Sequence, residues 1–568
     1  MNKNTKIIIG LVVLAAIVFG AIFGGMSLLD NAGKTDTQIS REDAAQDLAK
    51  YVERKVDVVE KTNPIKGTVD LESSSLAEEL PDINNYPFKV KGNGEINLEI
   101  FSSPEKAGSE TSNNDPEANT WLIEVVKNFN KQGYTIDGKT VTVSLRSVSS
   151  GLACDYISSG KYVPDAFSPS NEAWASMLQA KGVTLNQEAK SLVGNVAGIV
   201  LSKDTHEQLI NDYGAVNINT VIEATVNNEI AMGYTNPYAS STGLNFLMSS
   251  LYCFDANDPL SDEAVAGFQA FQANVPVVSY NTTQMQGAID SGVLDAMIME
   301  YQTFVNTSEL RNFIFVPFGV RHDNPLYSID TLSSEKQQAM DLFAEFATNA
   351  ESQKSAKEYG FGANPNYVSE IPEADGNTLL DAQELWKKEK DNGQEIVTVF
   401  IVDTSGSVDG APLNEMKTSL VNAAQYINPD HYVGLVTYNS SVTINLPIAQ
   451  FNLNQRAYFN GEIESLSAGG GTLTFDAIAV ALQMLEEARV DHPDAKFMLF
   501  VLSDGESSGS LKEVSGFIEN LNVPIYTIGY NANIAALQEI SKINEAASIN
   551  ADTDDIIYTL KNLFNAQM

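Results

Sequence analysis

Four uniformly apolar runs dominate the pattern of hydrophobic and polar positions in the C-terminal third of the chain. The runs cover residues 396–402, 432–438, 496–502 and 523–529, and helical spacing separates them at 412–427, 474–490, 510–520 and 533–545. Apolar strands that alternate with amphipathic helices are typical of a parallel β-sheet covered on both faces. The pattern therefore predicts an α/β domain over residues 395–568, whose ligands would bind at the carboxyl ends of the strands.

A second, less regular α/β pattern covers residues 95–370. Short β runs at 96–101 and 140–146 flank a helical segment at 121–130, and helical spacing around 336–359 closes the unit. Residues 371–394 are charged and predict a linker with some helix. Residues 30–94 are polar and weakly patterned, with one amphipathic helix from 42 to 59. We expect this stretch to be a membrane-proximal stalk with little core of its own.

The N-terminal region contains a stretch without charged residues, from Ile7 to Leu29. This stretch is long enough to cross a bilayer as a helix, and Lys3 and Lys6 before it place the N-terminus in the cytoplasm. A cleaved signal peptide is the alternative, but its apolar region is usually shorter and ends at a small-residue cleavage site, which is not evident here. We expect one transmembrane signal anchor at 7–29, with the bulk of the chain extracellular.

Composition excludes several classes of function. Lys and Arg total 35 against 73 Asp and Glu, which gives a net charge of −38. Such a chain repels phosphate backbones, so we expect no nucleic-acid partner. Four histidines and two cysteines leave little room for zinc or iron sites. Cys154 and Cys253 fall in what the pattern suggests are different lobes, so two separate buried thiols are favoured over a disulfide.

Oxygen-bearing side chains gather at the predicted strand ends of the C-terminal domain. Asp403, Ser405 and Ser407 follow the first strand, Thr472 follows three glycines, and Asp504 follows the strand at 496–502. Two carboxylates with hydroxyls and no nitrogen or sulfur ligand suit Mg²⁺ or Mn²⁺. Helix capping explains a single Ser or Asp at such a place, but it does not explain all five together.

This D-x-S-x-S motif, with Thr472 and Asp504 at later strand ends, resembles the von Willebrand factor A (VWA) domain. The resemblance implies a doubly wound, Rossmann-like sheet that carries a metal-ion-dependent adhesion site for Mg²⁺, or for Mn²⁺ or Ca²⁺. It implies that Ser405, Ser407 and Thr472 contact the metal, while Asp403 and Asp504 do so directly or through water. It also implies an open coordination position for a carboxylate of a protein partner.

Hydroxyl groups also mark the loops of the middle domain. The positions expected to line a cleft there are Ser102, Ser103, Ser149, Ser150, Ser240, Ser241 and Thr242. Hydroxyls beside free N–H groups at a helix start form a neutral cradle for an anion or polar ligand, although a cap or turn explains any single serine equally well. The arrangement resembles type 2 periplasmic or extracellular solute-binding proteins of ABC transporters. This resemblance implies two α/β lobes joined by a hinge, with the ligand between them.

One motif for catalysis is present but incomplete. Residues 505–509 fit G-x-S-x-G after a strand, as in a hydrolase nucleophile elbow. That fold requires a histidine after Ser507, and all four histidines precede it. We therefore expect a protein that is not an enzyme.

The combined interpretation is a membrane-anchored extracellular binding protein of bacterial type. Its VWA domain would dock a protein partner through a divalent metal, as in cell adhesion, and its solute-binding-like domain would capture or sense a small polar or anionic ligand. The alternative is an accessory solute-binding subunit of an ABC-type transport or metal-handling system.

Overall fold

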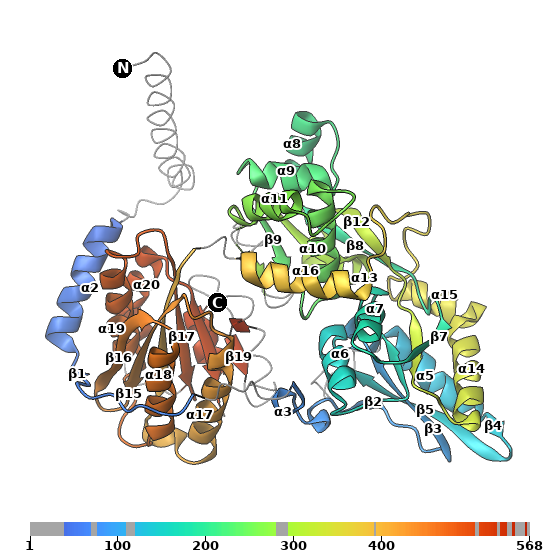
Figure 1. Cartoon of the computed structure of the whole chain (residues 1–568), viewed down its shortest axis with the longest axis horizontal. Helices are drawn as coiled ribbons and strands as arrows, with labels where there is room; N and C mark the ends of the chain where they lie inside the picture. Colours follow the sequence, from blue (N-terminus) through green and yellow to red (C-terminus); the bar gives the residue numbers. More distant parts are fainter. Residues whose placement is uncertain are drawn as a thin grey trace.

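A computed structural model gives the fold of the chain (Figure 1). It describes residues 39–69, 76–108, 120–275, 277–279, 294–390, 394–505, 510–530, 534–541 and 548–550, together with 560, 563 and 564. Within these ranges, no helix has the length and hydrophobicity needed to span a membrane. The anchor predicted at 7–29 lies outside the described residues.

The C-terminal domain is built on a seven-stranded sheet with the order β1-β16-β15-β14-β17-β18-β19. Its parallel strands are β14 (Ile396–Asp403), β15 (Tyr432–Tyr438), β17 (Lys496–Ser503), β18 (Ile525–Gly529) and β19 (Ser548–Asn550). The four predicted strands are therefore present and parallel. The neighbouring strand β16 (Val442–Gln450) runs antiparallel to β15 and was not predicted.

Helices cover both faces of this sheet, as the uniformly apolar strands require. Helices α19 (Thr474–Ala488), α20 (Ser515–Leu521) and α21 (Ile534–Ser541) contribute to the core on one face. Helices α17 (Ala411–Ala423) and α18 (Leu453–Ser465) contribute to the core on the other face. Alternate side chains of β14 enter the two cores, with Val399 in the first and Phe400 in the second. Both faces of the strand are therefore buried.

Residues 41–60 belong to this C-terminal domain, which corrects the expectation of a stalk. Helix α2 (Arg41–Lys55) packs on α19 and α20 and buries Ala44, Leu48 and Val52. Strand β1 (Val58–Glu60) then extends the sheet by pairing in parallel with β16. The predicted helix ends at Lys55 instead of 59, because the chain turns there to enter the sheet. Its amphipathic pattern reflected packing against residues more than 400 positions away.

The middle domain has two lobes. Lobe 1 contains a sheet with the order β2-β5-β3-β6-β13-β7. Its strands are β2 (Phe88–Val90), β3 (Ile96–Ser102), β5 (Lys139–Ser147), β6 (Ala166–Ser168), β7 (Leu185–Ala189) and β13 (Leu326–Ile329), and β4 (Thr135–Ile136) pairs with β5. Its helices are α3 (Leu76–Glu79), α4 (Pro104–Ala107), α5 (Trp121–Gln132), α6 (Ser150–Ser159), α7 (Ala173–Ala180), α14 (Ser334–Thr348) and α15 (Ala350–Glu358).

Lobe 2 contains a five-stranded sheet with the order β10-β9-β11-β8-β12. Its strands are β8 (Asn195–Leu201), β9 (Met232–Thr235), β10 (Val277–Ser279), β11 (Ala296–Glu300) and β12 (Ile314–His322), and its helices are α8 (Lys203–Tyr213), α9 (Ile218–Val226), α10 (Ser241–Phe254), α11 (Asp262–Gln272) and α13 (Tyr301–Asn306). The chain crosses between the lobes twice, from β7 to β8 and from β12 to β13. Cys154 on α6 and Cys253 on α10 are free thiols in different lobes, and Cys253 is only partly buried.

The segment expected to be a linker at 371–394 instead packs on both lobes. Helix α16 (Gly376–Glu389) contacts α7 of lobe 1 and α10 of lobe 2. The indole of Trp386 is fully buried and donates a hydrogen bond to the Tyr234 hydroxyl at 2.7 Å. Gly376 approaches the Ser176 carbonyl so closely that an added Cβ would lie 2.0 Å from its oxygen. The helix therefore forms part of the two-lobed domain.

We predict that Leu48→Ala destabilises the C-terminal domain. The Leu48 side chain is fully buried among core residues, so its truncation should cost about 2–5 kcal/mol of unfolding free energy. Hydrogen exchange of the β14 amides measures this loss within the one domain. Lys50→Ala, on the exposed side of the same helix, is the control and should change the opening free energy by less than about 0.5 kcal/mol. Equal protection in both variants would show that α2 does not support the sheet.

Candidate functional site

The first candidate site lies where β14 and β17 end side by side. These strands pair in parallel, so Asp403 at the end of β14 and Asp504 just after β17 come to the same edge of the sheet. The loop that carries Thr472 is bound to this edge by backbone hydrogen bonds. The Gly469 N–H donates to the Thr404 carbonyl at 2.9 Å, and the Gly406 N–H donates to the Gly470 carbonyl at 3.2 Å.

Three neutral hydrogen-bond donors hold the Asp403 carboxylate in place. Its Oδ1 accepts the backbone N–H of Ser405 at 2.8 Å. Its Oδ2 accepts the Ser503 hydroxyl at 2.8 Å and the Tyr438 hydroxyl at 3.0 Å. Asp403 is fully buried. Both oxygens therefore have fixed positions before any ligand arrives.

The electrostatics of this edge suit a cation. Burial raises the pKa of Asp403, and the nearby Asp504 carboxylate adds to that rise. Two neighbouring acidic groups at a largely buried place are stabilised by a positive charge. The Ser405 and Ser407 hydroxyls lie 2.9 Å apart beside them. The donor set of carboxylates and hydroxyls fits a hard divalent ion that retains water.

The five predicted residues differ in how far their side chains are exposed to solvent. Asp403 and Ser405 are fully buried, Asp504 is nearly so, Thr472 is partly exposed, and Ser407 is exposed. The edge is thus open on the side of Ser407. Among the described residues, no three His, Cys, Asp or Glu side chains form a group able to hold a metal. A metal here would therefore depend on the hydroxyls as well as on the two carboxylates.

Two residues of this site were not predicted from the sequence. Tyr438 ends β15 and Ser503 ends β17, and both hydroxyls bind the carboxylate of Asp403. Their positions at strand ends were the sequence feature from which a role in this site could have been inferred. Tyr438 ends a run that was read as apolar, and Ser503 follows the run predicted at 496–502, so neither residue was assigned a role.

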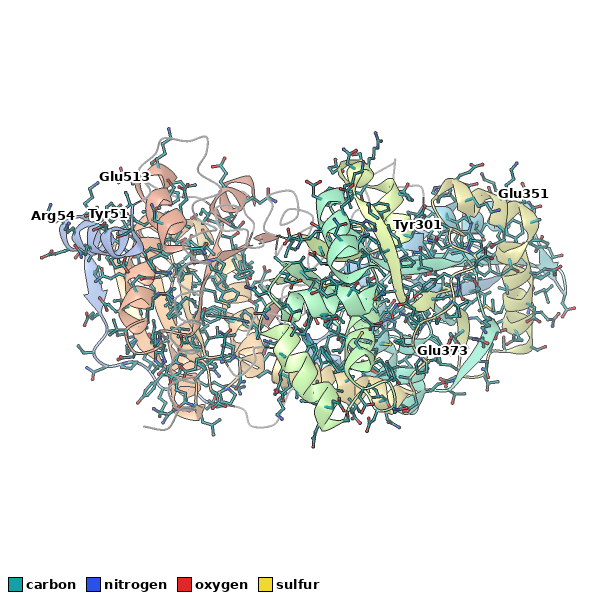
Figure 2. The ribbon with its side chains drawn as sticks, turned by 90° about the horizontal axis from the view of Figure 1, so that it is seen from above. Tyr51, Arg54, Tyr301, Glu351, Glu373 and Glu513 are labelled. Carbon is teal, nitrogen blue, oxygen red and sulfur yellow. The ribbon has the colours of Figure 1, made fainter. Side chains whose placement is uncertain are left out.

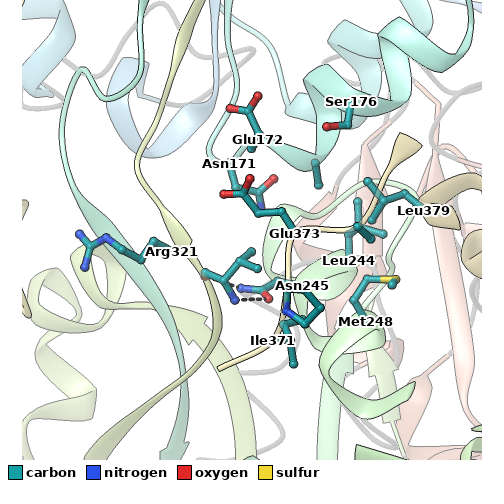
Figure 3. Close-up of a pocket in the computed structure, with 14 residues that line it drawn as sticks. Asn171, Glu172, Ser176, Leu244, Asn245, Met248, Arg321, Ile371, Glu373 and Leu379 are labelled. Carbon is teal, nitrogen blue, oxygen red and sulfur yellow. Dashed lines mark hydrogen bonds between the residues drawn. The ribbon is translucent and has the colours of Figure 1, made fainter. Parts of the chain in front are cut away.

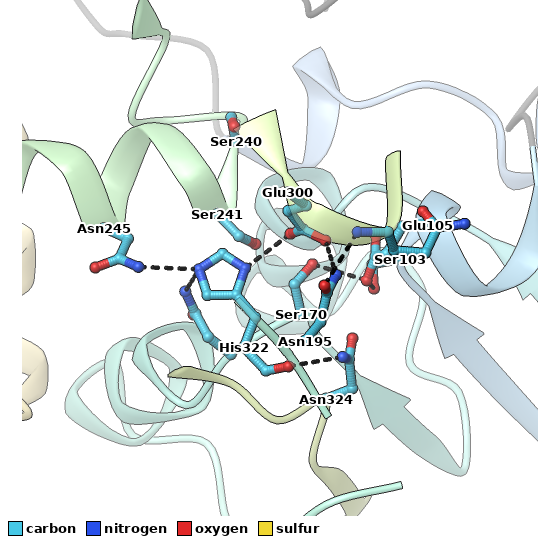
Figure 4. Close-up of polar contacts among 12 residues, drawn as sticks. Ser103, Glu105, Ser170, Asn195, Ser240, Ser241, Asn245, Glu300, His322 and Asn324 are labelled. Atoms are coloured by element: carbon cyan, nitrogen blue, oxygen red, sulfur yellow. Dashed lines mark hydrogen bonds and ion pairs between the residues drawn. The ribbon is translucent and has the colours of Figure 1, made fainter. Parts of the chain in front are cut away.

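The second candidate site is a buried polar cluster between the two lobes (Figure 4). Lys106 of lobe 1 is fully buried, and its ammonium donates to Glu105 Oε1 at 3.0 Å and to Asn324 Oδ1 at 2.7 Å. It also bonds the hydroxyl of Ser103. The Ser170 hydroxyl donates to the same Glu105 oxygen at 3.0 Å. The lobe 1 residues of this cluster thus form hydrogen bonds mainly with one another.

Lobe 2 contributes a second carboxylate and a histidine. His322 Nδ1 lies 2.8 Å from Glu300 Oε1, and Asn195 Nδ2 donates to Glu300 Oε2 at 2.8 Å. On the other side of the ring, the amide nitrogens of Asn171 and Asn245 each lie 3.2 Å from His322 Nε2. Since Asn171 belongs to lobe 1, the histidine joins the two lobes.

Charges in this cluster act on one another across the interface. Burial works to raise the pKa of Glu105, but the charge of Lys106 and the hydrogen bonds outweigh it, so that the pKa is lowered. Burial lowers the pKa of Lys106, against the opposing effect of Glu105. Burial, followed by the charge of Glu105, raises the pKa of Glu300. Lys106 therefore compensates two carboxylates that would otherwise repel each other.

The structure assigns most of the predicted cleft hydroxyls to contacts within the protein. Ser240 caps α10 by accepting the Gly243 N–H at 3.1 Å, and Ser241 accepts the Trp174 indole N–H at 2.8 Å. Ser103 belongs to the Lys106 cluster.

The other predicted positions are less central. The Ser102 hydroxyl donates to the Ser103 carbonyl at 3.4 Å, and Ser150 accepts the backbone N–H of Ser170 at 3.4 Å. Ser149 precedes α6, and Thr242 is buried in the first turn of α10. Their role toward a ligand stays a prediction. The charged members of the cluster, among them Glu300 at the end of β11, were not predicted.

Comparison with known families assigns both parts of the chain. Residues 115–362 match the bacterial extracellular solute-binding protein family, and residues 398–566 match the von Willebrand factor type A domain. The chain therefore carries a VWA domain at its C-terminus, preceded by a solute-binding protein domain, as the motifs predicted. Both are typically families of binding proteins without enzymatic activity.

Individual relatives are distant. The collagen alpha-6(VI) chain of Homo sapiens is 28% identical over 165 residues, which make up 28% of this chain and 7% of that protein. The chain thus spans less than a tenth of that relative's length. Among solved structures, iron-bound HitA from Pseudomonas aeruginosa is 13% identical, with a TM-score of 0.37, over 52% of this chain and 99% of that chain. A von Willebrand factor type A protein from Catenulispora acidiphila is 18% identical, with a TM-score of 0.27, over 30% and 42%.

We predict that Lys106→Met destabilises the two-lobed domain. Removing the ammonium leaves Glu105 and Glu300 buried without their shared counter-charge, which should cost about 3–5 kcal/mol. Hydrogen exchange of the β3 and β6 amides measures the loss. The matched double variant Glu105→Gln with Lys106→Met removes the like-charge repulsion, so it should recover part of the stability. A double variant less stable than Lys106→Met would contradict this account of the cluster.

Proposed function

We propose that this protein is a membrane-anchored extracellular binding protein that docks a protein partner through a divalent cation and captures a small ligand between its two lobes. The observation that carries the docking half is the setting of Asp403. Its carboxylate is buried beside Asp504 and oriented by three neutral donors. Such a group gains most from a metal ion at the open side of the edge.

The residues divide into two roles toward the ion. Ser405, Ser407 and Thr472 would hold it through their hydroxyls. Asp403 already accepts hydrogen bonds at both oxygens, so it would act through water, while Asp504 supplies the second negative charge. A bound Mg²⁺, Mn²⁺ or Ca²⁺ ion supplies an electrophilic position for a carboxylate of the partner.

Charge restricts the partner. Residues 395–568 contain 7 basic and 21 acidic side chains, a net charge of −14 (7 − 21). A partner that offers one carboxylate to the ion must bring a basic surrounding surface, because an acidic one would be repelled. The expected partner is therefore a protein with an isolated acidic side chain in a basic region.

The direction of α2 supports the proposed orientation toward the membrane. Arg41 at its start binds Glu486 near the end of α19, with Nη2 and Oε1 at 2.8 Å. Tyr51 near its end donates to Asp476 in the first turn of α19 at 3.0 Å, and Figure 2 shows it close to Glu513. The first turn of α19 follows the Thr472 loop. The chain therefore enters this domain at the end opposite the metal edge, which would face away from an anchor at 7–29.

We predict that Asp403→Ala abolishes binding of the divalent ion and of the partner. Native mass spectrometry of the purified protein should show one added Mg²⁺ in the wild type and none in the variant. Partner capture should fall at least tenfold in the variant and in wild type treated with chelator. The reason is that the ion loses the charge that the buried carboxylate provides.

Asp409→Asn is the matched control for this experiment. Asp409 is an exposed carboxylate two residues after Ser407 and is not among the proposed ligands. This variant should retain the ion and the partner. Metal retention by Asp403→Ala would refute the assignment of the site, and chelator-resistant capture would refute metal-dependent docking.

A further inference from the structure

A narrow cavity between the lobes has one apolar and one polar side (Figure 3). It contains about 460 Å³ of space that no atom fills, part of it open to solvent. The apolar side chains that line it include Leu244, Met248, Ile371, Pro372 and Leu379. The polar groups include Asn171, Glu172 and Glu373. Because residues 371–374 precede α16, the segment after the lobes supplies one wall.

Asn171 presents an unused hydrogen-bond acceptor at this cavity. The residue is 1% exposed, and its Oδ1 has no hydrogen-bond partner in the described part of the chain. Its orientation follows from His322. Since Nδ1 of that ring lies against the Glu300 carboxylate, Nδ1 carries the proton and Nε2 accepts from the Asn171 amide nitrogen. The amide oxygen is left for a donor that the described residues do not supply.

Two carboxylates lie beside this oxygen. Figure 3 shows the side chains of Glu172 and Glu373 on the same side of the cavity as Asn171. Burial raises the pKa of Glu172 and Glu373 raises it further, while the hydrogen bond from Tyr327 and the charge of Lys190 act in the opposite direction. The two carboxylates therefore stand close enough to repel each other. This side of the cavity therefore favours a ligand that brings a hydrogen-bond donor or a positive charge.

The basic residue that lines the cavity is already engaged. Arg321 Nε lies 2.9 Å from Asp323 Oδ1, and its Nη1 donates to the carbonyls of Asn364 and Tyr367. Figure 3 shows its guanidinium turned away from Asn171 and Glu373. Asn245 is likewise engaged, because it exchanges hydrogen bonds with the backbone of Val320 at 2.9 Å. An anion would therefore meet carboxylates here and few donors.

We propose that this cavity binds a small organic cation, with an ammonium group donating to Asn171 Oδ1 and to the carboxylates of Glu172 and Glu373. An apolar body of the ligand would contact Leu244, Met248 and Leu379. The proposal rests on the proposed capture of a small ligand between the lobes and replaces the polar or anionic ligand expected from the sequence. The recognised chemistry is a protonated amine that carries a short hydrocarbon group.

Calorimetry of the full-length protein at neutral pH with three probes of similar size tests the charge preference. The probes are n-butylammonium, n-butanol and butyrate, which carry positive, zero and negative charge. We expect n-butylammonium to bind at least tenfold more tightly than either of the others. Glu172→Gln and Glu373→Gln should each weaken its binding about tenfold, because each removes a charge and keeps the side-chain shape.

Two controls separate the outcomes. Glu351→Gln changes a carboxylate at the start of α15 that does not line the cavity, and it should bind n-butylammonium as the wild type does. Asp409→Asn should also bind it normally, because this exposed carboxylate lies in the other domain and is not among the proposed ligands. Circular dichroism melting verifies folding, and Glu373→Gln, on an exposed residue, decides the matter if Glu172→Gln does not fold.

Three results would overturn the proposal in distinguishable ways. Tighter binding of butyrate would show that a small ligand is captured but is anionic. Unchanged affinity in both Gln variants would place the ammonium elsewhere. Binding of none of the three probes would remove both the cation and the capture half of the proposed function. Mg²⁺ binding measured on the same samples would test the docking half independently.

Discussion

The architecture depends on one constraint, that the C-terminal sheet is completed by residues from the beginning of the chain. Helix α2 buries Leu48 against α19, and β1 pairs with β16. The following residues stay bound to the same domain, because the fully buried Glu462 carboxylate holds the Lys61 ammonium at 2.8 Å and the Ile65 N–H at 2.6 Å. The two-lobed domain is therefore an insertion into the VWA domain. Both ends of the two-lobed domain are thus connected to the C-terminal domain. If residues 30–94 formed a stalk, only the C-terminal end of the two-lobed domain would be connected to it.

This double attachment gives α16 a particular position. The helix is the last element before β14, and it contacts both lobes through packing on α7 and through the buried bond between Trp386 and Tyr234. Any change in the angle between the lobes must therefore be accommodated at α16 or at its contacts. The segment before it also forms a wall of the interlobe cavity. One continuous stretch of chain thus includes a wall of the interlobe cavity, a helix that contacts both lobes and the connection to the VWA domain.

The sequence correctly predicted those strands whose hydrophobic pattern matches their burial in the folded domain. Strands β14, β15, β17 and β18 are buried on both faces, so their apolar runs identify them, and Asp403 and Asp504 of the predicted metal site lie at the ends of two of these strands. Helix α2 has an equally clear apolar face, but a pattern cannot state what covers that face. The Lys106 cluster was missed because its members, from Ser103 to Asn324, are brought together only by the two crossings between the lobes.

Comparison of the buried acidic groups separates internal structure from candidate sites. The Lys106 ammonium compensates Glu105 and Glu300 within the protein, and His322 and Asn195 also bond Glu300, so this cluster can hold the lobes together without a ligand. Asp403 has only neutral donors at its oxygens and a second carboxylate nearby. At the cavity, Asn171 Oδ1 has no donor among the described residues, and Glu172, which Tyr327 bonds, lies near the carboxylate of Glu373. An incomplete set of partners for a buried acceptor is costly in a folded protein. Asp403, with a second carboxylate nearby, and Asn171, with a free acceptor at the cavity, are therefore where external cations are expected, a metal ion at the first and an organic ammonium at the second.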